Sequence, residues 1–270
     1  MTAVLTPALT AALTAALTPA FVLVVVLGLM VGSFLNVCIY RLPRKESVVW
    51  PGSRCGACGR SLAWFENVPV VSWVVLGRQC RSCRAPISVM YPAVELTTAF
   101  IFAGAFLVYG VQPLLLVRLV FACMMLVLFV IDLRHRILPD AITLPGIVLG
   151  VAASVVLPPG VRDSLLGAAL GGGMLWAISE GYFRLRGREG LGFGDVKMLA
   201  MIGAFLGWQS TLLTLFLASL AGSAAGVWLI VSRRGGMQSA LPFGTFLAVG
   251  ALVAAVAGDQ MVDWYVSLYQ

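Results

Sequence analysis

Two aspartates stand at the edges of long apolar stretches, where a lipid bilayer normally excludes carboxylates. Asp132 ends the apolar run Leu114–Ile131, and Asp195 opens another run directly after the glycine-rich stretch Gly190-Leu-Gly-Phe-Gly194. An ionisable residue at such a position is costly and therefore indicates function. Two carboxylates that meet can share one proton, so that the ionised member activates a water molecule while the protonated member polarises a carbonyl group. The pattern predicts an acid/base pair, provided that the fold brings Asp132 and Asp195 together.

Simpler roles are open for each of these aspartates. Asp132 is expected at a helix C-terminus, where the helix dipole disfavours a negative charge, and an ion pair with Arg134 or Arg136 could offset that cost. Asp195 could cap the helix that begins beside it. The flanking glycines Gly192 and Gly194 favour more than capping, because they leave room for another helix or an extended peptide.

The neighbouring charged residues have structural explanations. Asp140 follows a proline and precedes an apolar stretch, so we expect it to be a helix N-cap. We expect Lys197 to extend toward lipid headgroups and Glu95 and Glu180 to form interhelical hydrogen bonds or ion pairs with loop arginines. The single histidine, His135, has no evident serine partner, so nucleophilic catalysis has little support.

Composition predicts an all-α polytopic membrane protein. The 270 residues are 60% hydrophobic and only 11% charged, and runs of roughly 20 apolar residues cross a bilayer as helices. We expect about eight transmembrane helices, of which the sixth is short and could be a half-span. Their expected ranges are Ala20–Tyr40, Pro92–Tyr109, Pro113–Ile131, Ala141–Leu157, Ser164–Phe183, Val196–Leu206, Gln209–Val231 and Leu241–Ala257.

The positive charges fall in alternate loops of this topology. Nearly all of the 18 lysines and arginines follow the first, third, fifth and seventh predicted helices, and the positive-inside rule makes that side cytoplasmic. The net charge of +7 is therefore expected to face anionic lipid headgroups, not nucleic acid. The N-terminus is then outside, and both aspartates lie at the cytoplasmic rim. We divide the chain into residues 1–40, a cytoplasmic domain at 41–91, and a membrane domain at 92–270.

The cytoplasmic domain contains two Cys-x-x-Cys units, Cys55-Gly-Ala-Cys58 and Cys80-Arg-Ser-Cys83. Each unit can supply two ligands of a tetrahedral zinc site, and Gly56 and Gly59 favour the tight turn that this requires. Disulfides are the alternative, although a reducing cytoplasm opposes them. A four-cysteine site has no open position for water, so zinc here is expected to be structural. Cys38 and Cys123, in apolar stretches, are expected to be packing residues.

The motifs together resemble those of the bacterial type IV prepilin peptidases, which are membrane aspartic proteases. The resemblance covers residues 28 to about 250. Its motifs begin with Gly32-Ser-Phe-Leu-Asn-Val-Cys-Ile-Tyr-Arg-Leu-Pro43, the paired Cys-x-x-Cys units, Glu66-Asn-Val-Pro-Val-Val-Ser72 and Ile87-Ser-Val-Met-Tyr-Pro-Ala-Val-Glu-Leu-Thr97. They continue with Asp132, Leu138-Pro-Asp140, Gly192-Phe-Gly-Asp-Val-Lys197 and Pro242-Phe-Gly-Thr-Phe246.

This resemblance implies that Asp132 and Asp195 are the catalytic pair. It implies cleavage of prepilins or pseudopilins after the glycine that ends a short basic leader, at the cytoplasmic face of the bacterial inner membrane. It also implies N-methylation of the new terminus with S-adenosylmethionine, whose binding residues the sequence does not identify. We further expect Gly192, Gly194, Lys197 and Glu95 to contact the substrate. Two departures from the family pattern are Gly56, where proline is common, and Leu241-Pro-Phe-Gly-Thr-Phe246, where Glu-Pro-Phe-Gly-Pro-Phe is usual.

Two other classes of protein compete with this interpretation. A proton-coupled transporter would carry acidic residues deep within its spans, whereas the two aspartates lie at the rims. A non-catalytic assembly factor of a pilus or secretion system could keep the same fold. The intact pair of aspartates opposes that alternative. The sequence does not fix the oligomeric state.

Overall fold

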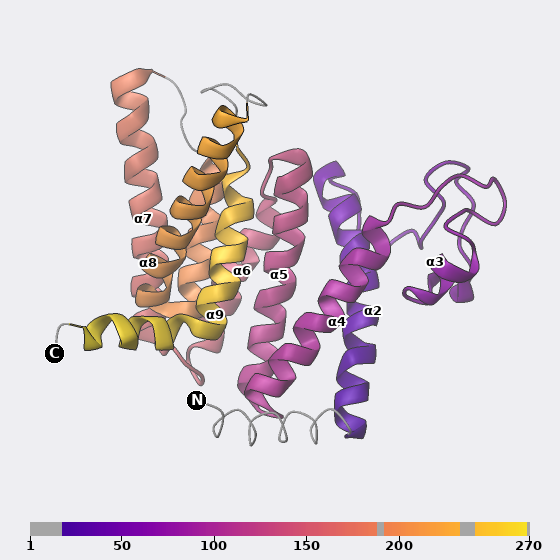
Figure 1. Cartoon of the computed structure of the whole chain (residues 1–270), viewed down its shortest axis with the longest axis horizontal. Helices are drawn as coiled ribbons and strands as arrows, with labels where there is room; N and C mark the ends of the chain where they lie inside the picture. Colours follow the sequence, from indigo (N-terminus) through magenta and orange to yellow (C-terminus); the bar gives the residue numbers. More distant parts are fainter. Residues whose placement is uncertain (1–17, 188–191, 233–240, 269–270) are drawn as a thin grey trace. The chain divides into compact units, whose positions relative to one another are not determined.

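The computed structural model describes residues 18–187, 192–232 and 241–268, and its regular structure over these ranges is helical. Two isolated bridges, Arg54 with Ser61 and Gln79 with Pro86, are the extended pairings among the described residues. The chain forms two compact units, Met1–Cys123 and Met124–Gln270, whose boundary lies inside helix α5 (Pro113–His135). Figure 1 shows the order of the helices. Arg188, Gly190, Arg233 and Arg234 lie outside the described residues.

Five helices are long and apolar enough to cross a membrane, which confirms the all-α polytopic prediction at this level. Two further helices do not qualify: α6 (Asp140–Ala153) has 14 residues, and the polar residues of α7 (Val161–Arg186) lower its mean hydropathy. The predicted ranges match the helices to within a few residues at most ends. The five helices are α2 (Pro19–Arg41), α4 (Met90–Tyr109), α5, α8 (Phe193–Val231) and α9 (Phe243–Ser267).

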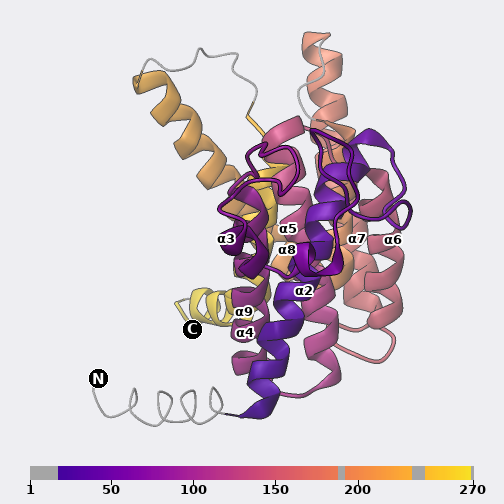
Figure 2. The same cartoon turned by 90° about the vertical axis from the view of Figure 1, so that its right-hand side faces the viewer.

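In the first unit, α2 packs along α4 through small residues (Figure 2). A Cβ added to Gly28 would lie 2.8 Å from the Cα of Ala99, and one added to Gly32 would lie 2.7 Å from the Cα of Glu95. Glycines at these positions therefore let the two backbones approach closely. The predicted polar domain follows α2 and precedes α4 in the sequence, and it has little regular structure. Its short helices are η1 (Leu42–Arg44), η2 (Trp64–Asn67) and α3 (Val71–Val75).

In the second unit, α8 breaks at Gly207, whose φ of 80° is a left-handed conformation that favours glycine. The two legs run in opposite directions (Figure 1), and the first packs on α7 while the second packs on α9. Ser164 Oγ of α7 donates a hydrogen bond of 2.7 Å to the carbonyl of Ala204. The separate helices expected at residues 196–206 and 209–231 are thus present as the two legs of α8.

The contact between α7 and α8 depends on glycine. A Cβ at Gly167 would lie 2.5 Å from the carbonyl oxygen of Gly203, whereas one at Gly173, six residues further along α7, would meet nothing within 4 Å. We predict that Gly167→Ala destabilises the protein by about 1–3 kcal/mol through overpacking. Gly173→Ala should be neutral or slightly stabilising, because alanine favours helix. Thermal unfolding of both variants in detergent measures this difference, and equal melting temperatures would contradict it.

Candidate functional site

Asp132 lies in the last turn of α5 and its residue is only 5% exposed. Its Oδ2 accepts two hydrogen bonds from Thr245, one from the backbone N–H at 2.6 Å and one from Oγ1 at 3.0 Å. Thr245 belongs to the first turn of α9, so the positive end of that helix dipole faces the carboxylate. Asp132 forms no ion pair with the described arginines, so the alternative of a pair with Arg134 or Arg136 is wrong.

Asp195 is the third residue of α8, whose N-cap position is Gly192. The residue is 9% exposed, and its backbone N–H donates to the carbonyl of Gly192 at 3.0 Å. Asp195 is therefore not the N-cap residue itself, although the N–H of Gly192 is hydrogen-bonded to its carboxylate. No ion pair to a described cation neutralises it.

Leu138, in the segment after α5, links the surroundings of the two aspartates. A Cβ on Gly194 would lie 2.9 Å from Leu138 Cβ, and one on Gly244 would lie 3.0 Å from Leu138 Cδ1. The same Cβ on Gly244 would lie 3.1 Å from Asp132 Oδ2. Both carboxylates thus belong to the second unit, and Asp195 lies within range of the charge on Asp132. The segments that carry these two acidic groups, remote in sequence, thus both pack on Leu138.

Asp140 and Lys197 form an ion pair beside this site. Lys197 Nζ lies 2.6 Å from Asp140 Oδ1 and 5.1 Å from the centre of the Phe193 ring. Asp140 is the first residue of α6 and caps nothing with its side chain, so the N-cap prediction is wrong. The start of α6 lies against α8, and the two opposite charges meet there. Lys197 is therefore held by a carboxylate instead of extending freely toward headgroups.

Glu95 belongs to the first unit, whereas both aspartates belong to the second. Its Oε2 accepts a hydrogen bond of 2.8 Å from the N–H of Val70, so α4 is tied to the backbone of the polar domain and not to a loop arginine. Val70 has a φ of 60°, which is unusual for a β-branched residue. Glu95 thus has a structural role through a hydrogen bond, which was one of the two roles expected from the sequence. Glu180 pairs instead with Arg184 of its own helix, at 2.7 Å, on the protein surface.

The four clustered cysteines form two turns of the same construction. Cys55 N–H donates to Arg60 O and Gly59 N–H to Cys55 O, and the second turn repeats both bonds between Cys80 and Ala85 and between Arg84 and Cys80, all at 2.9 Å. Gly59 and Arg84 occupy the equivalent left-handed positions, with φ of 70° and 57°. The four sulfurs lie within 4.8 Å of one another, and all six cysteines of the chain are free thiols.

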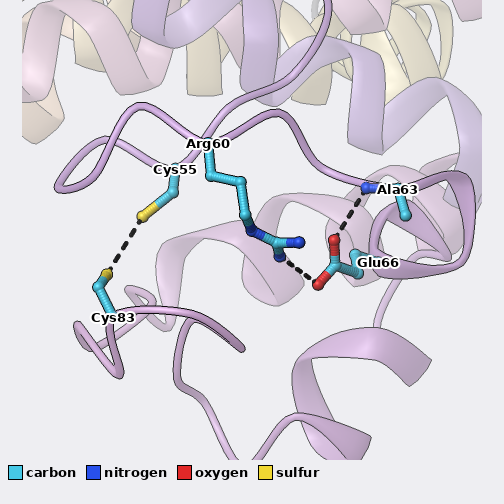
Figure 3. Close-up of polar contacts among 5 residues, drawn as sticks. All are labelled: Cys55, Arg60, Ala63, Glu66 and Cys83. Carbon is cyan, nitrogen blue, oxygen red and sulfur yellow. Dashed lines mark hydrogen bonds and ion pairs between the residues drawn. The ribbon is translucent and has the colours of Figure 1, made fainter.

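The cysteine cluster fits a tetrahedral metal ion. Four sulfurs at about 2.3 Å from a central ion are about 3.8 Å apart, and Cys55 Sγ and Cys83 Sγ lie 3.8 Å apart (Figure 3). Backbone N–H groups of Cys83 and Ser82 lower the pKa of Cys80 to about 6, which favours the thiolate that a metal requires. The disulfide alternative is wrong, because no pair of sulfurs is bonded.

An ion pair braces the first cysteine turn. Arg60 Nη2 lies 2.5 Å from Glu66 Oε1, and the N–H of Ala63 donates to Glu66 Oε2 at 2.8 Å (Figure 3). The Ala63 N–H and the Arg60 guanidinium hold the pKa of the buried Glu66 below its ordinary value. Glu66 is thus a structural residue of this domain.

A cavity of about 890 Å³ lies between the polar domain and helices α2 and α4, all within the first unit. Asn36 lines it and is 3% exposed; its Nδ2 donates to the carbonyl of Tyr91 at 3.0 Å, while its Oδ1 has no partner. Glu95 and four aromatic residues, Tyr40, Trp50, Trp73 and Tyr91, also line the cavity. Sequence reasoning missed Asn36 and Thr245, because neither residue type is catalytic by itself and both partners are remote in sequence.

Two family models match most of the chain. The bacterial peptidase A24 N-terminal domain matches residues 26–109, and the type IV leader peptidase family matches residues 119–227. The chain is also 38% identical over 261 residues to a prepilin leader peptidase/N-methyltransferase of Pseudomonas putida, which covers 87% of this chain and 89% of that relative. The chain belongs to the type IV leader peptidase family. The second family match includes both aspartates and ends before Thr245.

Other relatives carry the same name. One from Myxococcus xanthus is 42% identical over 208 residues, or 76% of this chain and 62% of the relative. Another from Aeromonas hydrophila is 34% identical over 267 residues, or 88% and 91% respectively. No solved structure shows a significant match to the chain.

Proposed function

We propose that this leader peptidase family member is an aspartic endopeptidase that cleaves the short basic leader from type IV prepilins or pseudopilins and then methylates the new N-terminus. The names of its relatives support both activities. The observation that supports the protease assignment is that Asp132 and Asp195 are both buried and that the charge of one acts on the other. A transporter or a non-catalytic assembly factor does not require such a pair at this position.

The proposed chemistry is direct attack by water. The ionised aspartate accepts a proton from water as the oxygen attacks the peptide carbonyl carbon, while the protonated aspartate hydrogen-bonds to the carbonyl oxygen. Collapse of the tetrahedral intermediate breaks the C–N bond, and the departing amine takes up a proton from the pair. Buried carboxylates with few donors suit this task, because low dielectric prevents both from ionising together.

We place the pair at the cytoplasmic face of the bacterial inner membrane. The proposed topology has eight crossings and an N-terminus outside. The crossings are α2, α4, α5, α6, α7, the two legs of α8, and α9. In this topology the basic loops share one side with both aspartates. In this topology residues 1–40 contain the first crossing, residues 41–91 form the cytoplasmic domain, and residues 92–270 form the membrane domain. Prepilin substrates would then approach laterally through the lipid, with the exposed Gly192 beside Asp195 as the point of nearest approach.

Replacing either aspartate tests the protease assignment. We predict that Asp132→Asn and Asp195→Asn each lower the prepilin cleavage rate by about 10³-fold or more, because the pair loses its shared proton. Asp163→Asn, in the first turn of α7 beside Gly207, is the matched control and should cleave normally. Cleavage of purified prepilin in detergent measures the rates. Wild-type protein that does not cleave, or aspartate variants that cleave at the wild-type rate, would contradict the proposal.

We propose that the cysteine cluster holds one structural zinc ion. Its four thiolates would fill a tetrahedral coordination shell and leave no position for water, so the ion would brace the polar domain and take no part in cleavage. The free energy of metal binding would then contribute to the folding of residues 41–91, which contain little regular structure.

Metal analysis tests the zinc proposal. We expect about one zinc per chain in the purified wild-type protein and none in Cys58→Ser, with a lower melting temperature in the variant. Cys123→Ser removes a thiol that lies outside the cluster and should keep its zinc. Zinc-free wild-type protein whose four cluster thiols all react with an alkylating reagent would exclude the site.

We further propose that the cavity of the first unit receives the methyl donor. Its volume is within the range of small-molecule sites, and the unpartnered Asn36 Oδ1 is an acceptor that an amino group could satisfy. When bound, S-adenosylmethionine would supply an electrophilic methyl group on a cationic sulfur. Glu95 and the aromatic lining suit a cation, through charge and through cation–π contact.

Separating the two activities tests this placement. We predict that Asn36→Leu lowers methylation of pre-cleaved pilin at least about tenfold and weakens binding of S-adenosylmethionine, because the buried acceptor is lost. Leader cleavage by the same preparation is the control and should remain near the wild-type rate. Equal binding of the methyl donor by the variant and the wild type in equilibrium dialysis would place its site elsewhere.

A further inference from the structure

The hydrogen bonds around the two aspartates are unequal. Thr245 donates twice to Asp132, and both bonds reach the same oxygen, Oδ2. The carboxylate of Asp195 accepts a hydrogen bond from the N–H of Gly192, and no side chain of another described element donates to it. Donors to a carboxylate stabilise its ionised form, so these hydrogen bonds favour a negative charge on Asp132 over one on Asp195.

The charges near Asp132 act in the same direction. Directly after its own helix, Arg136 attracts the negative form. The first turn of α9 contributes its dipole and no charged side chain. The charged group that faces Asp132 from α8 is Asp195 itself, and Leu138 is apolar. The nearby charges of Lys197 and Asp140 are paired with each other.

We propose that Thr245 is a positioning residue that keeps Asp132 as the ionised member of the pair and leaves the shared proton on Asp195. This inference rests on the proposed protease function and deepens it by assigning the two roles. Asp132 then deprotonates the attacking water. Asp195, beside the exposed Gly192, presents its proton to the substrate carbonyl.

The geometry also fixes how Asp132 can act. Since both donors bind Oδ2, Oδ1 is free to accept the water proton. The backbone donor is part of α9, so rotation of Asp132 away from the site would leave the N–H of Thr245 without its partner. Thr245 therefore orients the base as well as favouring its ionised form.

Three substitutions at one position separate these effects. Thr245→Ser keeps both donors, Thr245→Val removes only the hydroxyl, and Thr245→Pro removes the hydroxyl and the N–H. Proline is tolerated in the first turn of a helix, where Thr245 lies. Melting temperatures of all three establish that each variant is folded.

The readout is the pH dependence of single-turnover cleavage of prepilin. The acidic limb is the pH range in which the rate falls because Asp132 becomes protonated. We expect this limb to stay in place for Thr245→Ser, which keeps both donors. It should move to higher pH for Thr245→Val and further for Thr245→Pro, because each loses donors that stabilise the ionised carboxylate. At a pH on the acidic limb, the rates should fall about tenfold for the valine variant and about a hundredfold for the proline variant. At the plateau above the limb, where Asp132 is ionised in every variant, the rates should differ from the wild-type rate much less than on the limb.

A purely structural role predicts a different result. If the valine and proline variants lose activity by the same factor at every pH, or keep the wild-type limb, the role assigned to Thr245 is wrong. In that case the proposed protease function still stands, provided that the wild-type protein cleaves prepilin and loses activity at acidic pH. If the wild-type protein does not cleave at all, the proposed function itself is refuted.

Discussion

The described part of the second unit depends on one physical requirement: a carboxylate buried at the end of an apolar helix must find donors to replace water. Asp132 meets it through Thr245, and the contact joins the last turn of α5 to the first turn of α9. A helix C-terminus would otherwise repel this charge. The opposing N-terminus of α9 reverses the local field. The same contact that makes burial tolerable also decides which acid carries the charge.

Placing Asp195 beside this carboxylate requires close backbone packing. A Cβ at Gly194 or at Gly244 would crowd Leu138, so a side chain at either position would push these helices away from Leu138. Further along, Gly167 and Gly203 let α7 and the first leg of α8 meet backbone to backbone. Such approaches are a usual means of holding helices together in lipid, where burial of apolar surface offers little. Small residues thus give the site its rigidity.

Sequence reasoning recovered what local patterns encode. Hydrophobic runs located the helices, and Cys-x-x-Cys spacing located a cluster that can hold a metal. It failed where a partner was remote in the chain. Asp140 after Pro139 has the local appearance of a cap, yet the tertiary neighbour Lys197 provides the stronger interaction. Thr245 and Asn36 were missed for the same reason, since their roles arise from contacts that no periodicity reports.

The shortness of α6 has a consequence for water, which is the second reactant. A helix of 14 residues is about 21 Å long, while the hydrocarbon core of a bilayer is about 30 Å thick. The first leg of α8 is similarly short, because it reverses at Gly207. If both cross the bilayer as proposed, two short neighbours of this kind would require the surrounding lipid to thin or to admit polar groups. Water would then reach Asp132 and Asp195 through a locally thinned bilayer, and the protein would need no separate water channel.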